Sequence, residues 1–276
     1  MALFKKKKEE FYLKNPKGNT LNGQQYFGIS LGLIIGEQNG FYVDSLEPGS
    51  NTVYPLKQMM QNNWRIFDRN SALACIERIM NGKHSRHLFN RLLDICIAQG
   101  DFTEAEKIDF TGTEFEIEIQ EIEEEDDENE DDCEDEEENE ENEDDCEDEE
   151  NYQPNWIAVL PNLQNLEEIM NLEDGQEWLA GDFDIHADAW DFGRIIFVCR
   201  AAFSLGYISE DEAWQYIDNV TDMAKKLYTN WEDYATSYLL GRAMWCGDDD
   251  GGWEDVMAFA SGGLYDKQSP WKKLKW

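Results

Sequence analysis

Apolar side chains recur every three or four positions along most of the chain, and this spacing predicts helices rather than strands. The clearest case is 187–205, where apolar residues point in nearly every direction, so this helix is expected to be buried on most sides. The same pattern predicts helices over 23–36, 55–63, 70–80, 88–98, 163–172, 209–228, 231–246 and 253–259, followed by an extended tail over 269–276. No rhythm of alternating strands and helices occurs, so the predicted class is all-α, an irregular multi-helix globular domain.

An acidic segment over 114–151 interrupts the helical pattern. It contains 27 of the 61 acidic residues of the chain and no Lys or Arg. The decapeptide ENEDDCEDEE occurs there twice, at 128–137 and 141–150, with an offset that matches no repeat architecture. Dense like charge with few apolar residues cannot offset the entropy of ordering, so the segment is predicted to be a long disordered insertion. Alternating acidic and apolar residues over 114–122 also fit an edge strand, and both interpretations remain open.

The insertion divides the chain into a helical part over 1–113 and another over 152–276, and we expect their apolar faces to share one core. Outside the insertion, 34 acidic and 23 basic residues leave a net charge of −11, compared with −38 for the whole chain. A field of this sign repels nucleic acid and anionic membranes, so neither is expected as a partner. If the chain has a macromolecular partner, the charge favours a basic protein.

Cysteine usage and the amino-terminal residues indicate the cellular compartment. The six cysteines form no CxxC pair and no zinc-binding spacing, so we expect free, mostly buried thiols in a reducing compartment. The first residues, MALFKKKK, lack the apolar run of a signal peptide. The most apolar stretch, 26–36, is about half as long as a bilayer-spanning helix. The expected location is therefore the cytoplasm.

Several motifs in the carboxy-terminal half occur in a specific order. They are AWDFGR at 189–194, GYIS with a following EA at 206–213, WEDYA with SY and GR at 231–242, and SPW at 269–271. These motifs resemble the YbeU-like bacterial family, a domain-of-unknown-function family, over roughly 187–276, with a weaker similarity over 64–82. The resemblance implies a compact helical domain in a bacterial cytoplasm and carries no activity with it. The acidic segment is not part of the family pattern, which implies an insertion in this member.

A cluster of polar residues on two predicted helices is the best candidate site. Asp191 and Arg194 lie three residues apart in an apolar helix, where each charge needs a partner. Tyr234, Tyr238 and Arg242 lie at steps of four on a second helix, and we expect Arg242 to pair with Asp191. Two interpretations remain: a structural ion-pair network that fixes how the helices meet, or a pocket for an anion or carboxylate.

Other chemistry has weaker support. Asp182, Asp184, His186 and Asp188 alternate before the apolar helix, where they fit either a metal or acid–base site or the ordinary acidic start of a helix. No phosphate-binding loop, dinucleotide-binding fingerprint or zinc-hydrolase motif occurs, so no cofactor and no metal is predicted. Trp271 near the carboxyl end is expected to fill a hydrophobic groove rather than to bind a ligand.

Two functional hypotheses follow. The first is a non-enzymatic protein-interaction domain, with an immunity- or antitoxin-like role toward a basic partner as its concrete version, because the chain is acidic and rich in Trp and Tyr. The alternative is an enzyme or a small-ligand or anion-binding protein that uses the Asp/Arg/Tyr cluster. The second hypothesis requires a concave, partly open pocket at that cluster.

Overall fold

The computed structural model describes residues 11–18, 21–49, 53–82, 85–99, 156–179, 185–248 and 252–276. Within these residues every regular element is a helix, which confirms the predicted all-α class. The acidic segment over 114–151, with the edge strand considered for its first residues, lies outside the described residues. No helix in the described part of the chain is long and apolar enough to cross a membrane.

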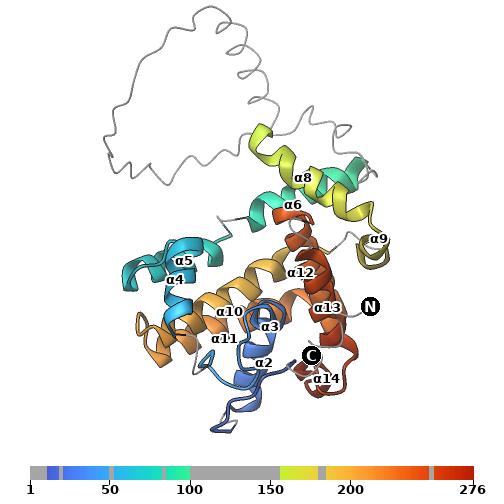
Figure 1. Cartoon of the computed structure of the whole chain (residues 1–276). Coiled ribbons are helices and arrows are strands. Elements are labelled where there is room, and N and C mark those ends of the chain that lie inside the picture. Colours follow the sequence, from blue (N-terminus) through green and yellow to red (C-terminus); the bar gives the residue numbers. More distant parts are fainter. Residues whose placement is uncertain are drawn as a thin grey trace, which may run out of the picture.

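The helices are named in chain order, as in Figure 1. They are α2 (Gly23–Leu31), α3 (Leu33–Gln38), α4 (Val53–Trp64), α5 (Arg69–Met80), α6 (Arg86–Gln99), α8 (Trp156–Met170), α9 (Glu173–Leu179), α10 (Asp188–Ser204), α11 (Glu210–Leu227), α12 (Trp231–Cys246), α13 (Gly252–Tyr265) and α14 (Pro270–Lys273).

Helix α10 occupies the centre of the fold. Its residues from Ala189 to Ala202 are all buried, as expected for a helix that is apolar in nearly every direction. It packs against α11 and α12 from the later part of the chain and against α2, α3 and α5 from the earlier part (Figure 1). Helices from before and after the acidic segment therefore pack against the same central helix.

Two glycines set the close approach of α10 and α12. A Cβ atom on Gly193 would lie 2.7 Å from Cε2 of Tyr238, and one on Gly241 would lie 2.4 Å from Cβ of Trp190. Real Cβ atoms do not approach other carbon atoms this closely, so only glycine fits at either position. Gly193 and Gly241 therefore allow the backbones of α10 and α12 to lie close together.

Capping residues define several helix ends. Ser209 and Glu212 form a capping box at the start of α11, and the side chain of Asn230 accepts a hydrogen bond from the N–H of Asp233 at the start of α12. Asp68 caps α5 in the same way through the N–H of Ser71. These local side-chain contacts explain why the boundaries of α11 and α12 follow closely from the sequence.

Three predicted elements differ in the structure. The single helix expected over 23–36 is two helices, because the chain turns at Gly32, where a Cβ atom would lie 2.8 Å from Cγ2 of Ile196 on α10. Helix α8 begins before its predicted start and contains Pro161, which sequence rules place in the first turn of a helix. The expected extended tail instead forms a short helix, α14, with Ser269 as its cap.

An aromatic cluster attaches the carboxy-terminal residues to the core. Trp271 stacks on Trp231 with ring centroids 5.0 Å apart, and its indole N–H donates to the carbonyl of Ser30 at 2.7 Å. Trp276 packs on the same Trp231 and donates its indole N–H to the carbonyl of Tyr228 at 2.6 Å. Each N–H is satisfied while the rings are buried or partly buried, so these indoles contribute to the fold.

Candidate functional site

Asp191 and Arg194 form a buried ion pair near the start of α10. Because three residues separate them on a helix, their side chains meet on one face, and Arg194 donates directly to the Asp191 carboxylate. Asp191 is 0% exposed and Arg194 is 3% exposed. Ser85, just before α6, donates to Oδ1 of Asp191 at 3.0 Å and accepts from Nη2 of Arg194 at 2.6 Å. The three side chains thus form a closed network that joins α10 to the start of α6.

Two indole rings enclose the guanidinium of Arg194. Its Cζ lies 4.9 Å from the ring centroid of Trp190 and 5.1 Å from that of Trp245, and both distances fit cation–π contacts. Trp245 is 43% exposed, whereas Trp190 is buried. The guanidinium therefore has a carboxylate, a hydroxyl and two aromatic faces as its surroundings.

The other three residues of the predicted cluster make different contacts. Tyr234 donates its hydroxyl to the carbonyl of Leu31 at 2.8 Å. Within the described residues the Tyr238 hydroxyl has no hydrogen-bond partner, and its ring packs edge-on against Trp190. Arg242 donates to the carbonyl of Gly247 at 3.1 Å. The expected pairing of Arg242 with Asp191 is wrong, because Arg242 stabilises the end of its own helix instead.

Burial controls the chemistry of the two tyrosines. Desolvation raises the pKa of Tyr234 well above its usual value, and it also raises the pKa of Tyr238, which the nearby Arg242 and Arg194 lower by a smaller amount. Both phenols are neutral at physiological pH. All five residues of the predicted cluster are buried, and none of them lines either of the two cavities described below.

The acidic residues before α10 do not converge on one point. His186 contacts the carboxylate of Asp94 at 2.9 Å, whereas Asp188 pairs with Arg86 at 3.4 Å and accepts from Asn90 at 3.0 Å. Asp182 and Asp184 lie outside the described residues. In the described ranges, no group of three or more His, Cys, Asp or Glu side chains is placed to hold a metal ion.

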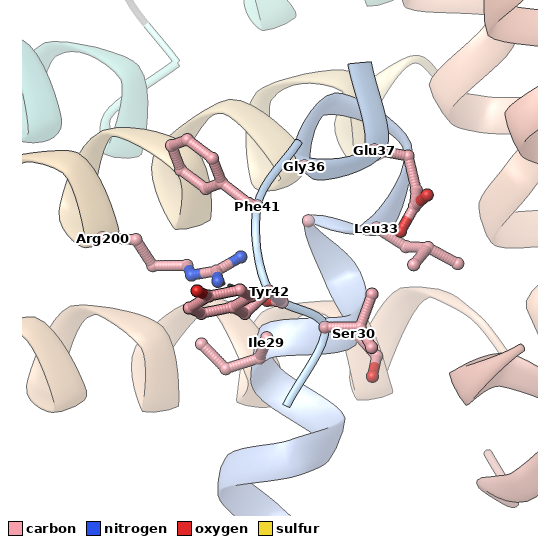
Figure 2. Close-up of a pocket in the computed structure, with 10 residues that line it drawn as sticks. Ile29, Ser30, Leu33, Gly36, Glu37, Phe41, Tyr42 and Arg200 are labelled. Carbon is pink, nitrogen blue, oxygen red and sulfur yellow. Dashed lines mark hydrogen bonds between the residues drawn. The ribbon is translucent and has the colours of Figure 1, made fainter. Parts of the chain in front are cut away.

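A small cavity lies beside Arg200 of α10 (Figure 2). Arg200 is buried and donates to the carbonyls of Tyr42, Ser45 and Leu46 at 2.5, 2.9 and 3.3 Å. Desolvation by burial lowers the pKa of Arg200 to about 9, and the charge of Asp44 offsets this decrease in part. The cavity has a volume of about 10 Å³, which suits a single water molecule rather than a ligand.

Glu37, at the end of α3, lines both this cavity and a larger one. Figure 2 shows Glu37 and Arg200 on opposite sides of the small cavity. Both oxygens of Glu37 accept from the backbone N–H of Tyr12, at 3.2 and 3.1 Å. The backbone of Tyr12 has a φ of 60°, which residues other than glycine rarely adopt. The hydrogen bond to Glu37 therefore holds the residues around Tyr12 in an uncommon turn. Burial raises the pKa of Glu37 to about 7.

The larger cavity, called the Glu37 groove below, has a volume of about 290 Å³. It lies where the segment around Tyr12 and the end of α3 meet α13 (Figure 1). Its lining residues are Phe11, Leu13, Glu37, Gln38, Gly40, Asp255 and Phe259. Sequence reasoning missed this site, because Glu37 follows a short apolar run and resembles an ordinary solvent-exposed helix end.

Residues 59–276 match the family described as "Protein of unknown function (DUF1266)". The match covers well over half of the chain, so the chain belongs to this family. It includes α10, α12 and α13, whereas Glu37 and α2 and α3 precede it. No curated protein matches the chain, and no solved structure matches it.

Proposed function

We propose that this protein is a non-enzymatic protein-interaction domain of the bacterial cytoplasm and that its partner is a basic protein. One observation carries the proposal. The residues best suited to chemistry, Asp191 and Arg194, bind each other in the core, whereas Glu37 and Asp255 line a groove whose described lining residues include no Lys, Arg or His. A buried ion pair supports packing registry, and carboxylates that line a groove support recognition of positive charge.

The concrete version of this function is an immunity- or antitoxin-like role, in which the acidic chain covers a basic protein. The net charge of −38 supports it, because opposite charge accelerates association and selects against acidic competitors. We also propose that within its family the chain is a YbeU-like member, on the motifs at 189–194 and 269–271.

The test is affinity capture from native bacterial lysate, with the full chain and with a variant that lacks residues 121–150. Each capture is washed at about 0.15 M and about 0.45 M salt, which shortens the Debye length from about 8 Å to about 5 Å. We expect one basic protein at stoichiometric amounts in all four captures, and the same complex when the two purified proteins are mixed. If binding of every captured protein is lost at the higher salt and also on deletion of 121–150, the contacts are unselective and the proposal fails.

The alternative function, an enzyme or an anion-binding protein built on the Asp191–Arg194 pair, has less support. An anion would have to displace Asp191 from Arg194 and pass Trp245 to reach the guanidinium. Thermal-shift screening with inorganic phosphate and small carboxylates tests it. A stabilisation that the Arg194→Met variant abolishes would favour this alternative over a protein-interaction domain.

A further inference from the structure

We propose that the Glu37 groove receives an arginine side chain of the basic partner. This inference rests on the proposed function and names the part of the surface that carries it. Two segments far apart in the sequence build the groove: residues 11–13 with the end of α3 on one side, and α13 on the other. The groove is therefore a property of the folded chain and is absent from any isolated helix.

Charge complementarity is the first support. Glu37 and Asp255 line the groove from different helices, and none of its described lining residues is Lys, Arg or His. Each oxygen of Glu37 accepts one hydrogen bond from the N–H of Tyr12, which leaves acceptor capacity on both oxygens. A guanidinium has five N–H donors in a planar arrangement and can bind two carboxylate oxygens at once.

The partial burial of Glu37 is the second support. Burial raises its pKa to about 7, because the carboxylate is desolvated and the hydrogen bond from the N–H of Tyr12 offsets this in part. A cation beside a desolvated carboxylate offsets that cost, and the effect is larger there than at an exposed carboxylate. A positively charged ligand in the groove therefore gains more from Glu37 than from the many fully exposed acidic residues of the surface.

The aromatic walls are the third support. The rings of Phe11 and Phe259 meet edge to face at 5.7 Å, with 73° between their planes. Both rings line the groove, so a planar guanidinium can stack on one of them while its N–H groups reach a carboxylate. The methylene groups of an arginine side chain also cover apolar surface such as Leu13, which is 40% exposed.

The size of the groove favours a single side chain over a larger ligand. The volume of about 290 Å³ lies at the lower limit for small-molecule sites and suits one long side chain. The described residues offer no set of three ligands for a metal ion. The groove thus fits an anchoring residue of a protein interface, where a single arginine in a pocket commonly contributes a large share of the affinity.

The test uses the full chain and a defined probe, the peptide acetyl-Gly-Arg-Gly-amide. Its citrulline counterpart has nearly the same shape without the charge. Binding is measured by calorimetry, and the location is measured by NMR shifts of the backbone amides of Phe11 and Gly40. We expect saturable binding of the arginine peptide with shifts at both amides and no binding of the citrulline peptide. Equal binding of the two peptides, or shifts only elsewhere, overturns the inference.

Three charge variants sharpen this experiment. Glu37→Gln and Asp255→Asn each remove one carboxylate of the groove, and each should weaken the peptide about tenfold, as for loss of one charge-assisted hydrogen bond. Glu254→Gln makes the same change in net charge at an exposed neighbouring position that does not line the groove, and it should leave binding unchanged. Equal weakening in all three variants means attraction by the overall field and contradicts a specific site.

The peptide experiment and the lysate capture fail separately. If the arginine peptide does not bind while a partner is captured, the groove inference is wrong and the proposed function stands. If the peptide binds in the groove but no partner is captured, the proposed function fails and the groove retains its specificity for arginine.

A variant without residues 1–8 tests whether the lysine-rich segment at 5–8 occupies the groove. If the arginine peptide binds about tenfold more tightly or better to this variant, the groove belongs to that segment and the inference is overturned.

Discussion

Two carboxylates in this fold have opposite surroundings. Asp191 is fully buried and has a guanidinium and a hydroxyl as partners, and two indoles enclose that guanidinium. Glu37 is less buried, yet its hydrogen bonds come from one backbone N–H, and its pKa rises to about 7. The difference teaches that burial alone does not identify a functional charge, because its partners decide whether the charge holds the fold together or is available to a ligand.

Adding a side chain at the contact between α10 and α12 should have the largest effect on stability. Gly193→Leu introduces a branched side chain where even a Cβ atom would lie 2.7 Å from Tyr238, so the helices that carry Asp191 and Tyr238 must separate. We expect a loss of more than about 3 kcal/mol and of the near-ultraviolet circular dichroism of the packed aromatics. Gly23→Leu is the control, because nothing lies within 4 Å of its added Cβ. Equal melting of the two variants would contradict the close packing.

Removing the partner of Asp191 should have the next largest effect. Arg194→Met leaves an uncompensated charge in the core and should destabilise the fold by about 3–5 kcal/mol in urea unfolding. Arg69→Met removes the Arg69–Glu212 pair, whose side chains are 51% and 32% exposed, and should cost at most about 1 kcal/mol. The double variant Asp191→Leu with Arg194→Met should recover much of the loss. Similar losses for Arg194→Met and Arg69→Met would mean that the Asp191–Arg194 pair is accessible to water.

Neutralising Glu37 should stabilise the fold in a pH-dependent way. A carboxyl group whose pKa is higher in the folded state than in the unfolded state contributes stability at low pH, and this stability is lost as the pH rises from about 4.5 to about 7. Glu37→Gln should therefore be more stable than the natural chain by up to about 3 kcal/mol at pH 8, with a much smaller difference at pH 5. Urea unfolding of both chains at the two pH values measures this. A difference that does not grow with pH would show that Glu37 is well solvated.

Deleting residues 121–150 should have the smallest effect. We propose that 1–113 and 152–276 form one folding unit, and we expect the deletion to change the melting temperature by about 1 °C or less with a single calorimetric transition. A loss of 1 kcal/mol would lower the melting temperature of a chain of this size by about 2–4 °C. A larger drop means that the segment packs against the fold, and two separated transitions contradict the single unit.

The sequence predicted the region around the Asp191–Arg194 pair better than it predicted the Glu37 groove. The burial of α10 on nearly every side and the meeting of Asp191 and Arg194 on one face follow from helical periodicity. The predicted partner of Arg242 was wrong. The spacing of residues along a helix shows on which face a side chain lies, but it does not show which turn of the neighbouring helix that side chain contacts. The alternative interpretation of the cluster as an open pocket could not be rejected from spacing alone.

Glu37 could not have been identified from the sequence. Glu37 is partly buried because the segment around Tyr12 packs against the end of α3 and because α13 lies beside it. Asp255 on α13 is 218 positions away from Glu37 in the sequence. No local pattern of apolar residues indicates either of these tertiary contacts. The break at Gly32 and the helical turn at 270–273 were missed for a related reason, since both depend on packing against distant partners, Ile196 and Trp231.

The bond from the indole of Trp271 to the carbonyl of Ser30 joins residues 241 positions apart. Contacts of such separation raise the contact order and slow folding, because a long loop must close before they form. During translation, α2 must wait for Trp271 to emerge from the ribosome before its partner is available. The nascent chain therefore exposes the apolar surface of α2 for most of its synthesis, and it is expected to interact with chaperones during that time.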